Sequence, residues 1–149
     1  MKATHRAYMA GILDGEGCVY VNRRKATGRR KTPGYGVKVC VSTTDKSLVD
    51  WMESNARLTS IYYNDKVEGN RKPKWQCTWN NSAAEWLLNQ TMRYLVIKTP
   101  QAELGLELLK HLRTTPAHRG QLTSDDVVAY RETIKARISK LNQRGRIAG

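Results

Sequence analysis

Acidic residues are scarce in this chain. Only 13 Asp and Glu stand against 26 Lys and Arg among 149 residues, so the net charge is +13. A folded protein with this excess needs a polyanionic partner. No apolar run approaches the ~20 residues that a membrane span requires, and the start of the chain lacks the charge, apolar stretch and cleavage site of a signal peptide. The sequence therefore predicts a soluble protein without a membrane partner, in the cytoplasm or an organellar matrix.

Cysteine is also rare. The chain has Cys18, Cys40 and Cys77, which are odd in number, far apart and without a C-x-x-C pair. We expect reduced thiols, which excludes a disulfide scaffold and argues against a zinc ribbon. The 3 histidines do not stand at metal-binding spacing, and we expect no catalytic or metal role for them.

Apolar residues make up 40% of the chain and fall in periodic clusters, which predicts a folded protein. We expect a helix over 4–15, strands over 18–24 and 35–43, a helix over 44–58, strands over 59–67 and 74–80, and helices over 82–94, from 100 onward and over 123–142. Short links between the strands favour antiparallel hairpins over parallel crossovers. The prediction is an α+β fold in a single domain over residues 1–149.

Local signals set the expected helix starts. Thr4 is a candidate N-cap of the first helix, and Thr44 or Asp45 opens the second. The spacing Ser82-x-x-Glu85 is typical of a capping box. Pro100 fits the first position of a helix, where its missing N–H costs nothing.

Positive charge concentrates in the two expected hairpin loops. Residues 23–31 hold six cations in nine positions. The second hairpin carries four more, Lys66, Arg71, Lys72 and Lys74. We expect both tips to point the same way, although a solvated loop is the simpler alternative. Strand alternation predicts that one set of side chains faces inward, namely Val19, Val21, Val37, Val39, Val41, Trp75, Cys77 and Trp79. The polar side chains between them face outward, where a narrow ribbon fits a major groove about 12 Å wide. The expected DNA-binding residues are Tyr20, Asn22, Arg24, Arg29, Arg30, Lys31, Lys38, Cys40, Ser42, Tyr62, Asn64, Lys66, Lys72, Lys74, Gln76 and Thr78.

The first expected helix combines small residues with misplaced acids. Ala7, Gly11 and Gly15 recur every four residues, which predicts a stripe that a second helix could approach closely. Packing on the chain's own sheet is the alternative, but each interior glycine costs about 1 kcal/mol relative to alanine. Asp14 and Glu16 follow at the helix C-terminus, where the macrodipole disfavours carboxylates. Their position indicates a metal site.

Residues 9–17, Met-Ala-Gly-Ile-Leu-Asp-Gly-Glu-Gly, resemble the LAGLIDADG signature of homing endonucleases, with Glu16 in place of the second Asp. The resemblance covers nearly the whole chain. It includes the αββαββα order, the run 39–46, the spacing Tyr94-Leu95-x-x-Lys98 and the closing run 138–142. It implies a LAGLIDADG core with extra C-terminal helices and an antiparallel, saddle-shaped sheet that lies on double-stranded DNA.

The resemblance also implies roles for single residues. By position, Glu16 would be the metal-binding acid and the main-chain carbonyl of Gly15 a further ligand. Hard oxygen ligands suit Mg2+, with Mn2+ as an alternative and Ca2+ supporting binding without cleavage. Lys98 matches the basic residue that polarises water or stabilises the phosphate, and a plain surface lysine is the alternative. Thr43 stands where many relatives carry a polar, water-organising residue, so we count it with Glu16 and Lys98 as catalytic.

One copy of the motif supplies one acid, and cutting two DNA strands takes two sites. The resemblance and the small-residue stripe together imply a two-fold homodimer. Its expected interface residues are Ala7, Ala10, Gly11, Asp14 and Gly15. The implied function is an intron-homing endonuclease that makes a staggered, metal-dependent double-strand cut by phosphodiester hydrolysis at a long, nearly palindromic site. No small-molecule cofactor is expected.

A second function shares this fold. A catalytically inactive DNA-binding regulator or an RNA splicing factor (maturase) would use the same basic saddle, so charge does not separate the two. Glu16 does, because a binder has no need of that acid. Its presence between glycines favours the enzyme.

Overall fold

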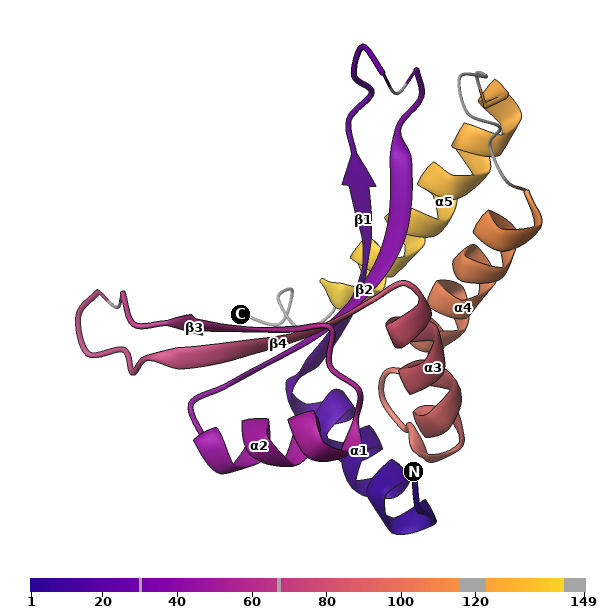
Figure 1. Cartoon of the computed structure of the whole chain (residues 1–149). Helices are drawn as coiled ribbons and strands as arrows, with labels where there is room; N and C mark the ends of the chain where they lie inside the picture. Colours follow the sequence, from indigo (N-terminus) through magenta and orange to yellow (C-terminus); the bar gives the residue numbers. More distant parts are fainter. Residues whose placement is uncertain (30, 67, 116–122, 144–149) are drawn as a thin grey trace.

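The computed structural model describes residues 1–29, 31–66, 68–115 and 123–143 (Figure 1). The elements are α1 (Ala3–Glu16), β1 (Gly17–Arg24), β2 (Gly34–Thr43), α2 (Lys46–Asn55), β3 (Ser60–Asn64), β4 (Lys74–Asn80), α3 (Ser82–Thr91), the 3-10 turn η1 (Met92–Tyr94), α4 (Thr99–Thr114) and α5 (Asp125–Asn142). This order confirms the predicted α+β class and the αββαββα core followed by two helices. No helix within the described ranges combines the length and the apolar character needed to cross a membrane.

The strands form one antiparallel sheet in the order β1-β2-β4-β3. All four strands overlap in two rows, Cys18–Cys40–Thr78–Ser60 and Gly17–Val41–Cys77–Ile61. On either side of these rows the sheet narrows, and the β1–β2 and β3–β4 hairpins project in different directions (Figure 1).

The expectation that both basic tips point the same way is wrong. The inner strands β2 and β4 are antiparallel neighbours. Strand β2 leaves the first tip at Gly34 and ends at Thr43, which pairs with Trp75 beside the second tip. The two tips therefore lie at opposite ends of the sheet, which spreads the positive charge along its length.

Strand alternation places the core on one face of the sheet. The inward side chains are buried, namely Val19, Val21, Val37, Val39, Val41, Cys77 and Trp79. In Figure 1 the helices gather on one side of the two hairpins, and they supply Met9, Leu13, Met52, Leu87 and Leu108 to the same core. This burial confirms the predicted inward residues of β1 and β2, while Trp75 on β4 is only half-buried.

Two predicted helix caps are wrong. Helix α1 begins at Ala3 with Lys2 as its N-cap, before Thr4. Helix α3 has no capping box, because Ser82 is its first helical residue rather than its N-cap, and Glu85 pairs with Arg113. Its N-cap is Asn81, at φ 47°, a backbone region that asparagine tolerates better than most residues.

The side chain of Asn81 serves the sheet. Its Oδ1 accepts a hydrogen bond from Val37 N at 3.1 Å. A Cβ at Gly36 would lie 2.6 Å from this oxygen. Glycine at this position therefore leaves room for the Asn81 side chain to approach β2.

Other boundaries agree more closely. Asp45 is the N-cap of α2, as predicted. Strand β3 ends at Asn64, earlier than predicted, and Val67 lies outside the described residues. The helix expected over 82–94 changes to a 3-10 turn after Thr91.

Trp79 tests this packing. It is 0% exposed, and its Nε1 donates to the carbonyl of Ala56 at 2.6 Å. We expect Trp79→Ala to lower the free energy of unfolding by about 3–5 kcal/mol through the cavity it leaves. Trp79→Phe retains a ring but leaves Ala56 O without its donor, which costs about 1–3 kcal/mol. Urea denaturation measures both free energies, and a Trp79→Phe variant as stable as wild type would contradict a role for the hydrogen bond.

Candidate nucleic-acid interface and active site

The sheet face away from the helices is polar. Cross-strand partners share a face, so the register aligns the rows Tyr62–Gln76–Ser42, Ser60–Thr78–Cys40–Cys18, Asn80–Lys38–Tyr20 and Gly36–Asn22. Apart from Gly36, which is buried, none of these residues is buried, and Tyr62 is 64% exposed. Asn64 and Lys74 extend the face toward one tip and Arg24 toward the other. The predicted outward strand residues therefore lie together on one accessible surface.

The loop cations flank this face. Arg29 and Lys31 are exposed in the first loop, while Arg30 lies outside the described residues. At the second tip, a cavity of about 580 Å³ is lined by Asn64, Lys66, Glu68, Arg71, Lys72 and Lys74. Such clusters suit phosphate oxygens.

Arg23 does not belong to this group. It pairs in register with Tyr35, which puts both on the helix side of the sheet. Its Nε donates to Glu132 on α5 at 2.7 Å. One of the six loop cations is thus matched within the chain and turned away from the polar face.

Sequence reasoning missed Asn80. It lines a polar cavity of about 250 Å³ with Asn22, Arg24, Gly36, Lys38 and Asn81. Asn80 follows Gln76 and Thr78 at the same strand parity, so the alternation itself could have identified it.

Asp14 organises the second part of the site. Its Oδ2 accepts Val96 N at 2.9 Å. Its Oδ1 accepts Ile97 N at 3.1 Å and Lys98 N at 3.0 Å. The last turn of α1 is therefore fixed to the segment before α4. Asp14 was expected at the subunit interface, and the three backbone groups that it binds belong to its own chain.

Lys98 and Glu16 lie on either side of this contact. Lys98 Nζ donates to the Asp14 carbonyl oxygen at 3.1 Å, a C-terminal helix carbonyl that has no helical donor. Glu16 is exposed as the last residue of α1. Within the part of the chain that the structure describes, no residue offers its carboxylate a hydrogen bond or an ion pair. The expected catalytic Glu16 and Lys98 are thus brought to the same end of α1.

A cavity of about 440 Å³ adjoins this end of the helix. Its lining includes Gly17, Cys18, Lys98, Gln101 and Asn142. Burial raises the pKa of the Cys18 thiol, and the nearby Lys98 ammonium opposes that shift. The thiol is therefore protonated at neutral pH and is a poor nucleophile.

The donor set fits a divalent cation only in part. Glu16 supplies a free carboxylate, and Gly15 has a C-terminal helix carbonyl beside it. Hard oxygens of this kind suit Mg2+. However, residues 1–29, 31–66, 68–115 and 123–143 hold no cluster of three His, Cys, Asp or Glu side chains suited to a metal ion. A cation bound here would take most of its ligands from water and from the substrate.

Thr43 does not join Glu16 and Lys98 in any contact that the structure describes. It pairs with Trp75, on the helix side of the sheet, and its Oγ1 accepts Asp45 N at 3.1 Å. Its catalytic role stays a prediction, and the observed contact gives it a structural role at the start of α2.

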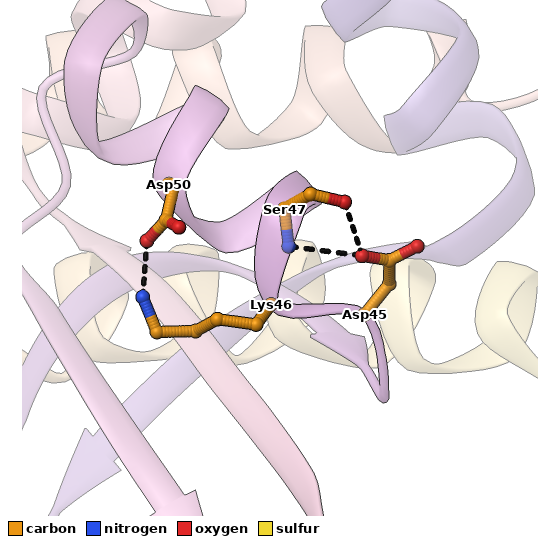
Figure 2. Close-up of polar contacts among 4 residues, drawn as sticks. All are labelled: Asp45, Lys46, Ser47 and Asp50. Atoms are coloured by element: carbon orange, nitrogen blue, oxygen red, sulfur yellow. Dashed lines mark hydrogen bonds and ion pairs between the residues drawn. The ribbon is translucent and has the colours of Figure 1, made fainter.

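The N-terminus of α2 carries its own polar cluster. Figure 2 shows the Asp45 carboxylate accepting from the hydroxyl of Ser47 and from Ser47 N, while Lys46 pairs with Asp50. The Ser47 hydroxyl is the main cause of a lowered pKa at Asp45, with the backbone N–H next. Every side chain here is exposed, and the cluster caps α2.

The expected interface residues divide into two groups. Ala7, Gly11 and Gly15 are exposed along one face of α1, and a Cβ at either glycine would meet no heavy atom within 4 Å. Ala10 is 0% exposed within the chain, so its assignment to a subunit interface is wrong. It points into the core because it lies off the i, i+4 stripe.

Two residues beside this stripe were missed. Val96 is 82% exposed and Ile97 is 66% exposed, although both are apolar. Their backbone N–H groups bond Asp14, which holds them next to α1. Sequence patterning gave no indication of this, because the segment has no helix or strand period.

Asp14→Asn tests the junction. An amide has only one accepting oxygen, so at least one of the N–H groups of Val96, Ile97 and Lys98 loses its acceptor. We expect a loss of about 1–3 kcal/mol in the free energy of unfolding, with faster amide exchange at residues 96–98. Asp50→Asn, in an exposed pair on α2, is the matched control and should leave both unchanged. The junction would be refuted by equal exchange in the two variants.

Comparison with known proteins places the fold. No family model and no curated protein sequence matches the chain. Among solved structures, the homing endonuclease I-CvuI, in complex with DNA, superposes with a TM-score of 0.73 at 16% identity, covering 93% of this chain and 82% of that one. The archaeal intron-encoded homing endonuclease I-Vdi141I, complexed with DNA, gives 0.69 at 10% identity, covering 93% and 84%.

A longer enzyme matches over part of its length. The meganuclease I-SmaMI, bound to uncleaveable DNA, gives a TM-score of 0.68 at 14% identity, covering 88% of this chain and 43% of that one. The similarity to I-CvuI and I-Vdi141I, in contrast, extends over most of both chains. The chain has the fold of the LAGLIDADG homing endonucleases, as the motif at residues 9–17 predicted.

Proposed function

We propose that this protein is a homodimeric, site-specific DNA endonuclease that hydrolyses phosphodiester bonds with a divalent cation. One observation carries the proposal. The Asp14 carboxylate fixes the segment 96–98, so that an unpaired acid, Glu16, and a cation, Lys98, lie at the end of α1 where β1 begins. An acid and a cation placed beside a basic, polar sheet face suit hydrolysis of a nucleic-acid backbone.

The polar face would hold the duplex. Arg29, Arg30, Lys31, Lys66 and Lys72, near the two tips, would contact phosphates and supply most of the affinity. The strand residues between them would reach base edges in the major groove. Because the tips lie at opposite ends of the sheet, one subunit would follow the duplex along its axis, which favours a long recognition site.

Glu16 and the Gly15 carbonyl would hold the cation. When bound, Mg2+ would neutralise charge on the scissile phosphate and favour ionisation of a water nucleophile. Lys98 would keep one N–H on the Asp14 carbonyl and present its other donors to phosphate oxygen or to water. The Asp14 contacts would hold that ammonium in place, so that little reorganisation is needed when substrate binds.

The exposed stripe supports the dimer. Gly11 and Gly15 leave the backbone of α1 uncovered, and Val96 and Ile97 add exposed apolar surface beside it. Two-fold packing of α1 on a second copy would cover all four residues. It would also set two Glu16 carboxylates near the axis, one for each DNA strand, for a staggered cut at a nearly palindromic site.

The solved relatives support both DNA and metal. Structures of I-CvuI hold DNA in the presence of Mg, where the DNA is not cleaved, and in the presence of Ca. We extend this chemistry to the present chain because its Glu16 carboxylate is unpaired. A protein that selects and binds one sequence but cuts nothing in Mg2+ or Mn2+ would instead be the inactive DNA-binding regulator.

A cleavage selection tests the proposed function. The protein is incubated with Mg2+ and plasmids that carry randomised inverted-repeat inserts, and the linear products are sequenced. We expect one nearly palindromic consensus with cuts offset between the strands. Recovery of no linear product, or of breaks without a consensus, contradicts a site-specific endonuclease.

Glu16→Gln tests the acid. The amide keeps the size of the side chain but removes the charge that would attract a cation. We expect DNA affinity in Ca2+ to be retained and Mg2+-dependent cutting to be lost, as measured by gel shift and plasmid linearisation. Glu103→Gln, the same charge change at an exposed position of α4, should cut like wild type. Robust cutting by Glu16→Gln would remove this residue from the mechanism.

Gly11→Leu tests the dimer. A Cβ at Gly11 would meet no heavy atom within 4 Å in the monomer, and loss of a helix-interior glycine stabilises a helix by about 0.5–1 kcal/mol. We therefore expect a monomer at least as stable as wild type that no longer dimerises or cuts. Ala129→Leu adds similar bulk at an exposed position of α5 and should stay dimeric. Sedimentation velocity measures the oligomeric state of each variant. A wild-type protein that is monomeric on its DNA contradicts the two-site scheme.

A further inference from the structure

The two hairpins are supported differently. Strand β4 pairs with β2 only from Lys38 to Thr43. The outer part of the first hairpin, where residues 21–24 pair with 34–37, is therefore two-stranded. An isolated two-stranded hairpin is marginally stable in water, so something else has to hold this outer part in place.

Helix α5 supplies contacts along that hairpin. At its C-terminal end, Asn142 Nδ2 donates to the carbonyl of Val19 at 2.9 Å. In its middle, one Glu132 oxygen accepts both Arg23 Nε, at 2.7 Å, and the hydroxyl of Tyr35. In Figure 1, α5 lies beside β1 and β2 over much of its length.

An adjoining side of α5 is fixed to α4 and to the residue that follows it. Arg131, next to Glu132, is 5% exposed. Its Nε donates to His111 Nε2 at 3.2 Å, and its Nη2 donates to the Thr115 carbonyl at 3.2 Å. Ile134 is buried as well. Helix α5 is thus fixed to the rest of the protein, and its contacts with the first hairpin can hold that hairpin in place.

Arg23 and Arg24 lie on opposite faces of the sheet. Arg23 faces α5 with Tyr35, whereas Arg24 lies on the polar face. The Glu132 contact therefore acts on the strand directly behind the residues that would face DNA. The same contacts lower the pKa of Glu132, chiefly through the Tyr35 hydroxyl, so the carboxylate is charged at neutral pH.

We propose that Glu132 is a positioning residue for DNA recognition. It sets the tilt of the β1–β2 hairpin, and with it the register of Asn22 and Arg24 on the bases. This inference rests on the proposed function for its DNA readout. The β3–β4 hairpin has no such contact among the described residues, so it serves as an internal reference.

A binding-site selection on Glu132→Gln tests the proposal. Base pairs read by each hairpin are first assigned with Asn22→Ala and Tyr62→Ala. Glu132→Gln keeps one accepting oxygen but loses the charge that pairs with Arg23. We expect preference at the β1–β2 positions to fall by about fivefold or more, the factor that corresponds to a lost interaction of ordinary strength. Preference at the β3–β4 positions should not change. Loss of preference at both sets, or at neither, overturns the proposal.

Two further variants separate positioning from stability. Glu107→Gln removes a carboxylate that accepts the Tyr130 hydroxyl between α4 and α5 at 2.7 Å, away from the hairpin. It should leave both sets of positions at wild-type preference. Tyr35→Phe removes only the hydroxyl from a buried ring and should reproduce the confined loss, even where Glu132→Gln folds poorly.

Hydrogen exchange of the free protein tests the contact without DNA. In Glu132→Gln and Tyr35→Phe, amides over 21–24 and 34–37 should exchange about fivefold faster, while those of β3 and β4 keep their rates. Unchanged exchange in the first hairpin overturns the proposal. A wild-type protein that selects no sequence contradicts the proposed function, and exchange then decides on the contact itself.

Discussion

The carboxylate of Asp14 holds together the parts of the molecule on which its chemistry depends. It accepts three backbone N–H groups from a segment more than 80 residues away in the chain. A carboxylate at the C-terminus of a helix is disfavoured by the macrodipole, and these donors offset that cost. These donors occupy Asp14, whereas the neighbouring Glu16 has no such partner among the described residues.

Several features follow from this junction. Lys98 is the N-cap of α4, and its ammonium donates to the Asp14 carbonyl oxygen. Val96 and Ile97 are held out beside the bare stripe of Gly11 and Gly15. The proposed active site and the proposed subunit interface thus both adjoin the Asp14 contacts, which would couple assembly to catalysis.

Strand alternation provides the second constraint. One parity of the sheet buries Val37, Val39 and Val41, and the other leaves Lys38, Cys40 and Ser42 accessible. Since period-2 alternation is visible in the sequence, this separation of core and polar face could be predicted there. The LAGLIDADG-like motif likewise predicted the fold, which superposition on I-CvuI and I-Vdi141I confirms.

What the sequence did not reveal depends on tertiary contacts. The hairpin directions required the β2–β4 pairing, which no local pattern specifies. The predicted capping box is absent because Asn81, whose side chain bonds β2, is the N-cap of α3 and Ser82 already lies in the helix. Ala10 was placed on an interface because small residues were read as a group, whereas helix geometry turns it into the core. The acceptor role of Asp14 and the contact of Glu132 with Arg23 likewise join residues distant in sequence.

A mixed dimer gives the most direct test of the central claim, that each subunit supplies one acid to cut one strand. Wild-type and Glu16→Gln chains with different affinity tags are co-expressed, and the heterodimer is isolated by two purification steps. On a supercoiled plasmid with one target site, in Mg2+, the account predicts nicked circles as the end product. Linear product formed at the wild-type rate, or no cutting at all, would contradict it.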